Sequence, residues 1–189
     1  RLILTGGLRA DRTVIADGFF READASGAVS EDSRFADRSD WTLTYRAGAL
    51  LRATPALDLR AAAYSGLRLP TLNELYRPFV VFPVVTQANA DLANEELRGF
   101  EAGLDWRPLG GVELSLTAFD NRLENAIANV TIGPNLRQRR NLPAIETQGI
   151  EAGLRVARGP IRFDGSVSYS DPTIAGEGAS LPLDGNAPP

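Results

Sequence analysis

The 189-residue sequence contains no His, Cys, Met or Lys, so all 20 of its basic residues are arginine, and its formal net charge is −4. Without these residue types the span cannot build a His/Cys zinc site, a Ser-His-Asp triad, a Cys-His pair, a Walker lysine or a Schiff-base lysine. The absence of Cys excludes a disulfide-stapled secreted miniprotein, and the mildly acidic balance disfavours nucleic acid as a partner. Chemistry by paired carboxylates remains possible, as does binding without catalysis.

Alternation of apolar and polar residues with a period of two dominates the chain. In residues 41–52, for example, Trp41, Leu43 and Leu51 stand at odd positions and polar residues stand at most of the even ones. Such alternation predicts strands with one apolar face and one polar face. The predicted strands, in chain order, are 2–9, 41–52, 57–68, 100–107, 112–118, 150–157 and 161–169, with further short pieces expected within 10–40 and 80–90.

The connections between these strands alternate between short and long. Short Pro/Gly-containing turns, typical of tight reversals, are predicted at 54–56, 108–111 and 158–160. Long polar connections are predicted at 10–40, 69–97, 121–147 and 170–189. This sorting favours an antiparallel meander with tight turns at one end and elaborate loops at the other, as in a transmembrane β-barrel, over a soluble β-sandwich.

The two predicted faces differ in the way that a barrel in a membrane requires. Aromatic residues stand near the strand ends of the apolar face, as Phe100 and Trp106 do in one strand and Phe163 and Tyr169 in another. Amphipathic rings prefer the headgroup level, so these residues predict aromatic girdles. The opposite face carries Arg and acidic side chains, which a wet lumen accommodates and lipid does not.

A series of motifs in a fixed order resembles the barrel of TonB-dependent outer-membrane receptors. The residues that carry the resemblance lie between about 41 and 188. They are Tyr64-Ser-Gly-Leu-Arg-Leu-Pro-Thr-Leu-Asn-Glu-Leu-Tyr76, Ala88-Asn-Ala-Asp-Leu-Ala-Asn-Glu-Glu-Leu97, Phe100-Glu-Ala-Gly-Leu-Asp-Trp106, Phe119-Asp-Asn-Arg-Leu-Glu-Asn-Ala-Ile127, Gln138-Arg-Arg-Asn141 and Gln148-Gly-Ile-Glu-Ala-Gly-Leu154. Departures from the family pattern, such as Leu69 in place of Ala, affect the stiffness of a loop.

This resemblance implies an all-β fold in which residues 1–189 are one part of a 22-stranded transmembrane barrel, with short periplasmic turns and long extracellular loops. We expect the plug domain and the closing strands to lie outside this segment. The implied function is energised uptake of a scarce bulky nutrient, a ferric siderophore or cobalamin, across the bacterial outer membrane. The implied partners are the TonB complex (through a coupling box), the protein's own plug and outer-membrane lipid; no cofactor and no catalysis are implied.

Two other classes of protein stay open at this point. One is a soluble β-sandwich binding module, which alternation alone would also fit. The other is an outer-membrane barrel enzyme whose catalytic residues lie outside the span, since the absence of His excludes a hydrolytic triad within it.

Candidate binding residues follow from the motifs. The family motif Pro70-Thr71-Leu72-Asn73-Glu74-Leu75-Tyr76 is expected to shape the exit from a strand into a loop, and Tyr76 and Arg77 to meet the ligand there. Arg137, Arg139 and Arg140 form the densest basic cluster, for which three interpretations stay open: attraction of an anionic chelate, pairing with acidic plug residues, or a place among the charges of the lumen wall. Asp91, Glu95 and Glu96 are candidate calcium ligands through their carboxylates, without the spacing of an EF-hand.

Overall fold

The computed structural model describes residues 1–188, which form eleven strands, one short α-helix and one 3-10 helix. Seven long strands make up most of the molecule. They are β1 (Leu2–Ile15), β4 (Arg38–Thr54), β5 (Leu57–Arg68), β8 (Glu95–Leu109), β9 (Val112–Gly133), β10 (Leu136–Arg158) and β11 (Ile161–Ala175). They correspond one to one with the seven predicted strands, although most extend further than predicted.

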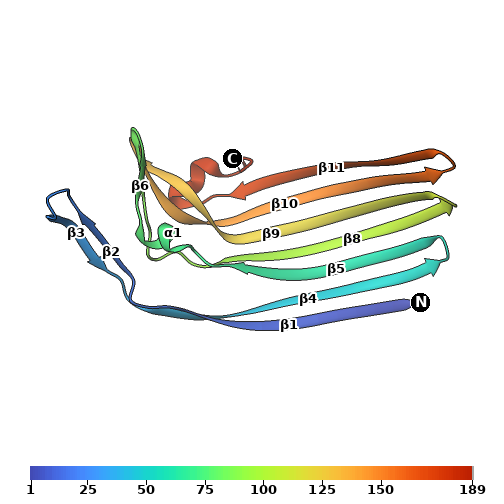
Figure 1. Ribbon diagram of the computed structural model, residues 1–189, viewed down its shortest axis with the longest axis horizontal. Coiled ribbons are helices and arrows are strands. Elements are labelled where there is room, and N and C mark those ends of the chain that lie inside the picture. Colours follow the sequence, from blue (N-terminus) through green and yellow to red (C-terminus); the bar gives the residue numbers. More distant parts are fainter. Residues whose placement is uncertain (189) are drawn as a thin grey trace.

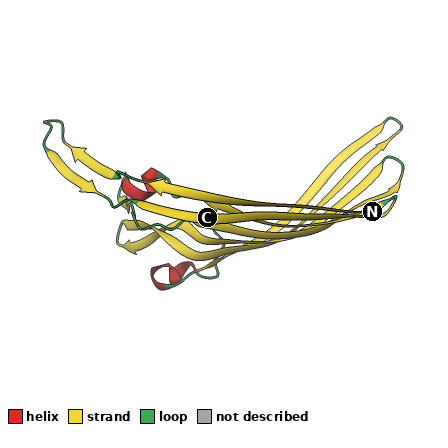
Figure 2. Cartoon of the chain, turned by 90° about the horizontal axis from the view of Figure 1, so that it is seen from below, coloured by secondary structure: helices red, strands yellow, loops and turns green. Residues whose placement is uncertain are grey.

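The long strands form a single curved sheet in which each strand pairs antiparallel with its neighbour (Figure 1). The order β1-β4-β5-β8-β9-β10 follows the chain, and β11 pairs with β10. Figure 2 shows that the sheet is bowed and open at both edges. One bowed sheet is the shape of part of a barrel wall, and the two facing sheets that a sandwich requires are absent from residues 1–188.

The tight reversals gather at one end of the sheet, which we call the turn end. Residues 55–56, 110–111 and 159–160 connect β4 to β5, β8 to β9 and β10 to β11. Gly111 and Gly159 adopt φ values of +79° and +59°, a left-handed conformation that glycine adopts without a steric cost. All three short turns predicted from the sequence are confirmed.

The long connections gather at the opposite end, the loop end (Figure 1). Between β1 and β4 the hairpin of β2 (Phe19–Ala23) and β3 (Val29–Arg34) projects beyond the sheet, and between β5 and β8 lie α1 (Leu72–Tyr76), β6 (Phe79–Val81) and β7 (Val84–Gln87). These are the short pieces predicted within 10–40 and 80–90. After β11 the chain forms the 3-10 helix η1 (Gly178–Leu183).

The predicted long connection at 121–147 is wrong. β9 continues to Gly133 and β10 begins at Leu136, so the two strands extend together and reverse through Pro134 and Asn135 alone. Asn135 has a φ of +54°, which Asn tolerates better than most residues do. The polar composition of this stretch belongs to two strands that continue together, paired in register, towards the loop end.

The register of the strands aligns apolar residues into rows on one face, which we call the apolar face. One row runs from β1 to β11 through seven partners, and its members are Leu2, Leu51, Leu59, Leu104, Leu116, Ala152 and Val167. Aromatic residues border this band and are exposed, with Phe100 at 55% and Tyr169 at 69%. Large apolar side chains so exposed on a continuous face are solvated by lipid in a membrane barrel.

Fully buried side chains occur in two clusters at the loop end. One contains Ala126, Val130, Leu142 and Ile174, with Leu183 of η1 packed against it. The other contains Leu75, Tyr76 and Leu92, packed against Ile15, Phe35 and Ile127. Because residues of one parity share a face, Ile15 of β1 places the second cluster on the polar face. Among residues 1–188, no helix has the length and apolar character needed to cross a membrane.

Candidate functional site

The polar face of the seven-stranded wall carries ion pairs that run from strand to strand. Arg107 of β8 donates to Asp58 of β5 over 2.6 Å, and Arg60 of β5 lies 3.3 Å from Asp105 of β8. Arg60 also donates to the Thr117 hydroxyl of β9 over 2.7 Å. These contacts link β5 to β8 and β9 across the polar face.

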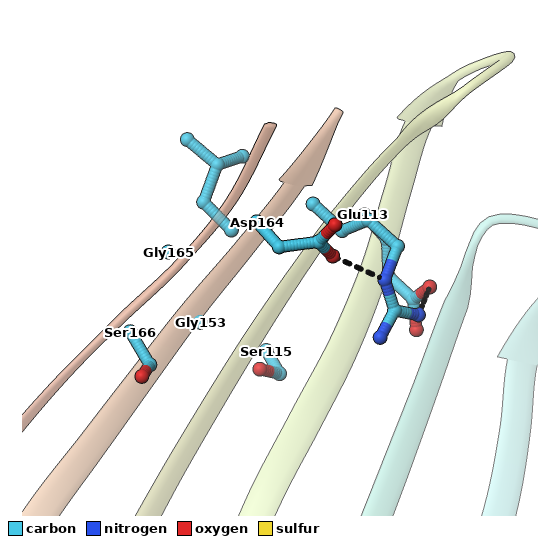
Figure 3. Close-up of a pocket in the computed structure, with 8 residues that line it drawn as sticks. Glu113, Ser115, Gly153, Asp164, Gly165 and Ser166 are labelled. Atoms are coloured by element: carbon cyan, nitrogen blue, oxygen red, sulfur yellow. Dashed lines mark hydrogen bonds and ion pairs between the residues drawn. The ribbon is translucent and has the colours of Figure 1, made fainter. Parts of the chain in front are cut away.

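A polar cavity of about 350 Å³ lies on this face near the turn end (Figure 3). Its central cation is Arg155 of β10, which donates to Asp164 of β11 over 2.9 Å and to Glu113 of β9 over 3.3 Å. Ser115, Gly153 and Ser166 complete the polar lining. The arginine lies between two carboxylates from the two neighbouring strands. These ion pairs link β9, β10 and β11, and the cavity lies beside them.

At the loop end, residues 69–94 form a folded segment that we call the strap. The strap leaves β5, and its strand β7 pairs parallel to the far side of β10, at residues 136–138, before the chain returns to β8. It therefore crosses β8 and β9, and its buried residues pack against Ile15, which lies on the polar face of β1. The barrel mouth in this region is thus covered by an ordered element with its own buried core.

The family motif at 70–76 forms the helix of the strap. Thr71 is the N-cap of α1: its hydroxyl accepts from the Glu74 amide, and the Glu74 carboxylate accepts from the Thr71 amide over 2.7 Å. This reciprocal arrangement is a capping box. The sequence prediction that the motif shapes the exit from the strand agrees with this geometry.

Arg68, the last residue of β5, connects the helix to the wall. Its guanidinium donates to Glu74 and to the buried carboxylate of Glu95 at the start of β8. These hydrogen bonds raise the pKa of Arg68 further above its ordinary value, with the bond to Glu95 contributing most. Burial acts to raise the pKa of Glu74, but the hydrogen bonds from Thr71 and Arg68 outweigh it and hold that pKa below its ordinary value.

The two predicted ligand residues, Tyr76 and Arg77, have different environments. The Tyr76 side chain is buried; its ring stacks on Phe35 with centroids 4.4 Å apart and fills the space beside Gly18, where an added Cβ would lie 2.9 Å from the ring. The Arg77 side chain is exposed. Tyr76 thus joins the strap to the base of the β2–β3 hairpin. Contact of either residue with a ligand remains a prediction.

The basic cluster does not share one face. Arg137 and Arg139 point to the polar face, whereas Arg140 points to the apolar face and donates to Gln138 over 2.9 Å. Arg139 donates to the carbonyl oxygens of Asn73 and Arg77, and its guanidinium lies 5.0 Å from the Phe79 ring centroid. Burial lowers the pKa of Arg139. Arg139 is committed to the strap, and contact of these arginines with the lumen or the plug remains a prediction.

Three further polar residues that fix the strap were not singled out from the sequence. Arg38 donates to the carbonyl of Leu92 over 2.7 Å, Asn89 donates to the carbonyl of Arg139 over 3.0 Å, and Asn141 exchanges hydrogen bonds with the amide and carbonyl of Ala93. Asn141 lies in one of the family motifs. Its pairing with a backbone 48 residues away has no local signal that could have revealed it.

The calcium interpretation of Asp91, Glu95 and Glu96 is wrong. Strand alternation turns Glu95 to the polar face and Glu96 to the apolar face. Glu95 is buried and accepts from Arg68 and from the Ile127 amide over 2.6 Å, while Glu96 lies 3.8 Å from Arg98. Within residues 1–188 no three acidic side chains converge as a metal site would require.

The wall, with its lipid-type outer face, charged inner face and strap over the mouth, matches a known family. The model of the TonB dependent receptor-like β-barrel matches residues 1–189. The chain therefore belongs to the TonB-dependent receptor β-barrel family, whose members are outer-membrane receptors and transporters and not enzymes.

Individual relatives agree with this assignment. The vitamin B12 transporter BtuB of Vibrio vulnificus (strain YJ016) is 26% identical over 152 residues, which are 79% of this chain and 23% of that protein. The FrpB iron transporter of Neisseria meningitidis (F3-3 variant) superposes with a TM-score of 0.61 at 21% identity, over 92% of this chain and 23% of that one. The copper transporter OprC superposes with a TM-score of 0.72 at 17% identity, over 92% and 27%.

The structural matches, being below 25% identity, establish the fold alone. The chain spans about a quarter of the length of these relatives. Its described residues are accordingly one sector of a barrel.

Proposed function

We propose that the protein containing this sector is an outer-membrane receptor that takes up a scarce bulky nutrient, of the ferric siderophore or cobalamin class, with energy from the TonB complex. The observation that carries the proposal is the family match over the whole chain. The sorting of the two faces supports it, because the apolar rows suit lipid and the braced polar rows suit a lumen.

The substrate class rests on a narrower basis. The curated relative at 26% identity is a vitamin B12 transporter, which supports cobalamin. The iron-transporter neighbour supports a ferric chelate only through a shared fold. Both classes are bulky, and both suit a protein that binds without breaking a bond.

The proposed division of labour places ligand capture at the loop end and passage along the polar face. Arg77 is the residue of the strap that we assign to ligand contact, because its side chain is exposed while its backbone is fixed by Arg139. Arg137, which is also exposed and points to the polar face, is assigned to the protein's own plug. The TonB complex would act through a coupling box and the plug, both outside the described residues.

The test is uptake by cells that lack their own cobalamin and siderophore receptors and express the full-length protein. We expect uptake of labelled cyanocobalamin or of a labelled ferric siderophore, and its loss when TonB is deleted. Uptake that persists without TonB, or uptake of neither class, would contradict the proposal.

A matched pair of variants tests the residue assignment in the same cells. Arg77→Ala should weaken surface binding by about tenfold, the scale of one hydrogen bond from a charged group. Arg34→Ala removes an exposed arginine from the β2–β3 hairpin and should leave binding unchanged. Equal binding by the two variants would remove Arg77 from the site.

A further inference from the structure

The polar face of the wall contains an aromatic side chain that lies along the sheet instead of projecting from it. Tyr64 of β5, Gly99 of β8 and Asn121 of β9 are consecutive partners in one register row. The Tyr64 ring extends over Gly99, and its hydroxyl donates to the Asn121 side-chain oxygen over 3.1 Å. One side chain therefore spans two strand spacings, roughly 10 Å, across the wall.

Gly99 makes this position of the ring possible. A Cβ at residue 99 would lie 2.3 Å from Cε2 and 2.6 Å from Cζ of Tyr64, and 2.4 Å from the Asn121 oxygen. These contacts are far inside the van der Waals distance, and all of them involve the ends of side chains, not backbone. A methyl group at residue 99 would thus push the ring off the wall while leaving the strands free to pair.

The same relation recurs nearby. The Arg60 guanidinium lies over Gly103, where an added Cβ would be 3.1 Å from its Cζ, and reaches the Thr117 hydroxyl on β9. Phe119 of β9 lies over Gly149 of β10, where an added Cβ would be 2.4 Å from the ring. Long side chains of three rows are therefore laid flat over a glycine of the next strand. At Gly103 and Gly149, however, an added Cβ would also meet a backbone oxygen, so Gly99 is the position where the effect can be isolated.

We propose that Gly99 is a positioning residue that holds Tyr64 flat against the lumen wall and so keeps the substrate path clear. The inference rests on the proposed transport function, since it assigns the cleared space to the passing ligand. Tyr64 makes no contact with the ligand in this account. Its ring would obstruct the path if it projected from the sheet, and the hydrogen bond to Asn121 helps to keep it flat against the wall.

The experiment uses the full-length receptor with three variants and a matched control. Gly99→Ala introduces the methyl group that displaces the ring, and Gly99→Ala with Tyr64→Ala removes the ring as well. The control is Gly66→Ala, on the same face of β5, where an added Cβ meets only the Leu97 side chain at 3.7 Å, an ordinary contact. Tyr64→Phe identifies the Tyr64 signal in 19F NMR of protein labelled with 3-fluorotyrosine.

The position of the ring is measured first, because it needs no ligand. We expect Gly99→Ala to move and sharpen the Tyr64 fluorine signal as the ring leaves its packed site, and Gly66→Ala to leave it in place. An unchanged signal in Gly99→Ala would overturn the proposal.

Transport is then measured with labelled cyanocobalamin and labelled ferrichrome as probes. Gly99→Ala should lower the uptake rate by about tenfold, the scale of one overpacked methyl group, with surface binding unchanged. The double variant should restore uptake, and Gly66→Ala should match the unsubstituted receptor. A displaced ring with normal uptake, or a double variant as slow as Gly99→Ala, would overturn the clearance role. Uptake of neither probe by the unsubstituted receptor would count against the proposed function, while the fluorine signal would still decide whether Gly99 holds the ring.

Discussion

The wall and the strap are built from the same chain by opposite means. The wall contains most of the large exposed apolar residues, such as Trp106 at 46% and Val167 at 68%, and its strands are held by backbone ladders and cross-strand ion pairs. The strap contains side chains that are removed from solvent, including Leu75 at 1% and Leu92 at 0%. The wall therefore depends on lipid to cover its apolar rows, whereas the strap carries a small core of the kind found in water-soluble proteins.

Because of this difference, we expect the two regions to tolerate different substitutions. In the wall, the odd or even position of a residue along its strand decides whether its side chain is on the apolar or the polar face. Whether a polar substitution destabilises the barrel therefore depends on which of the two faces carries it. In the strap, the result depends on individual contacts between segments that are distant in sequence, such as Tyr76 with Phe35. Three substitutions in the full-length protein test this contrast.

The largest effect is expected within the core of the strap. Leu75→Ala should destabilise the docked strap by about 2–5 kcal/mol, because it leaves a cavity where the leucine was fully buried. Hydrogen exchange of residues 69–94 measures the loss. Leu72→Ala is the control in the same helix, since Leu72 is 66% exposed; equal protection in the two variants would show that the strap has no core of its own.

A somewhat smaller effect is expected at the centre of the apolar band. Leu116→Arg should destabilise the barrel in lipid by about 2–4 kcal/mol, the cost of an arginine near the bilayer midplane. Ser115→Arg, one residue earlier, faces the polar cavity beside Glu113 and should be tolerated. Reversible unfolding in bilayers by urea measures both variants. If they were equally destabilised, the assignment of the two faces would be wrong.

The smallest effect is a dependence of the strap on pH. The lowered pKa of Glu74 means that its carboxylate stabilises the strap fully above its unfolded-state pKa, near 4.5, and loses that contribution as the pH falls through the lower folded value. We expect roughly 1 kcal/mol, the scale of a helix cap, measured as faster exchange of the α1 amides below that range. Glu74→Gln should abolish the dependence, and a Gln variant that kept it would assign the titration elsewhere.

The wall could be predicted from the sequence and the strap could not. Alternation is a local signal, so the partners Leu59 and Leu104 each indicate their face without knowledge of the other. The same local rule separates Arg139 from Arg140, and it was missed because a run of like charges suggested a single patch. Glu95 with Arg68, 27 residues apart, and Asn141 with Ala93, 48 apart, leave no periodic signal.

What the sequence determined by itself was an all-β sector with tight turns at one end, one face for lipid and one for a lumen. It also supplied the family, through motifs such as the one at 70–76. The absence of His, Cys and Lys, which first excluded several kinds of catalysis, suits a wall of this kind.

Only the tertiary structure decided how the loop end is used. The strap docks over the polar face because its buried leucines meet Ile15 and Ile127, which lie on strands far apart in the chain. Likewise, Tyr64 lies flat because a neighbouring strand offers a glycine in the same register row. Periodicity within a strand decides on which face a side chain lies. The contacts that the side chain makes there depend on the residues that strand pairing places next to it.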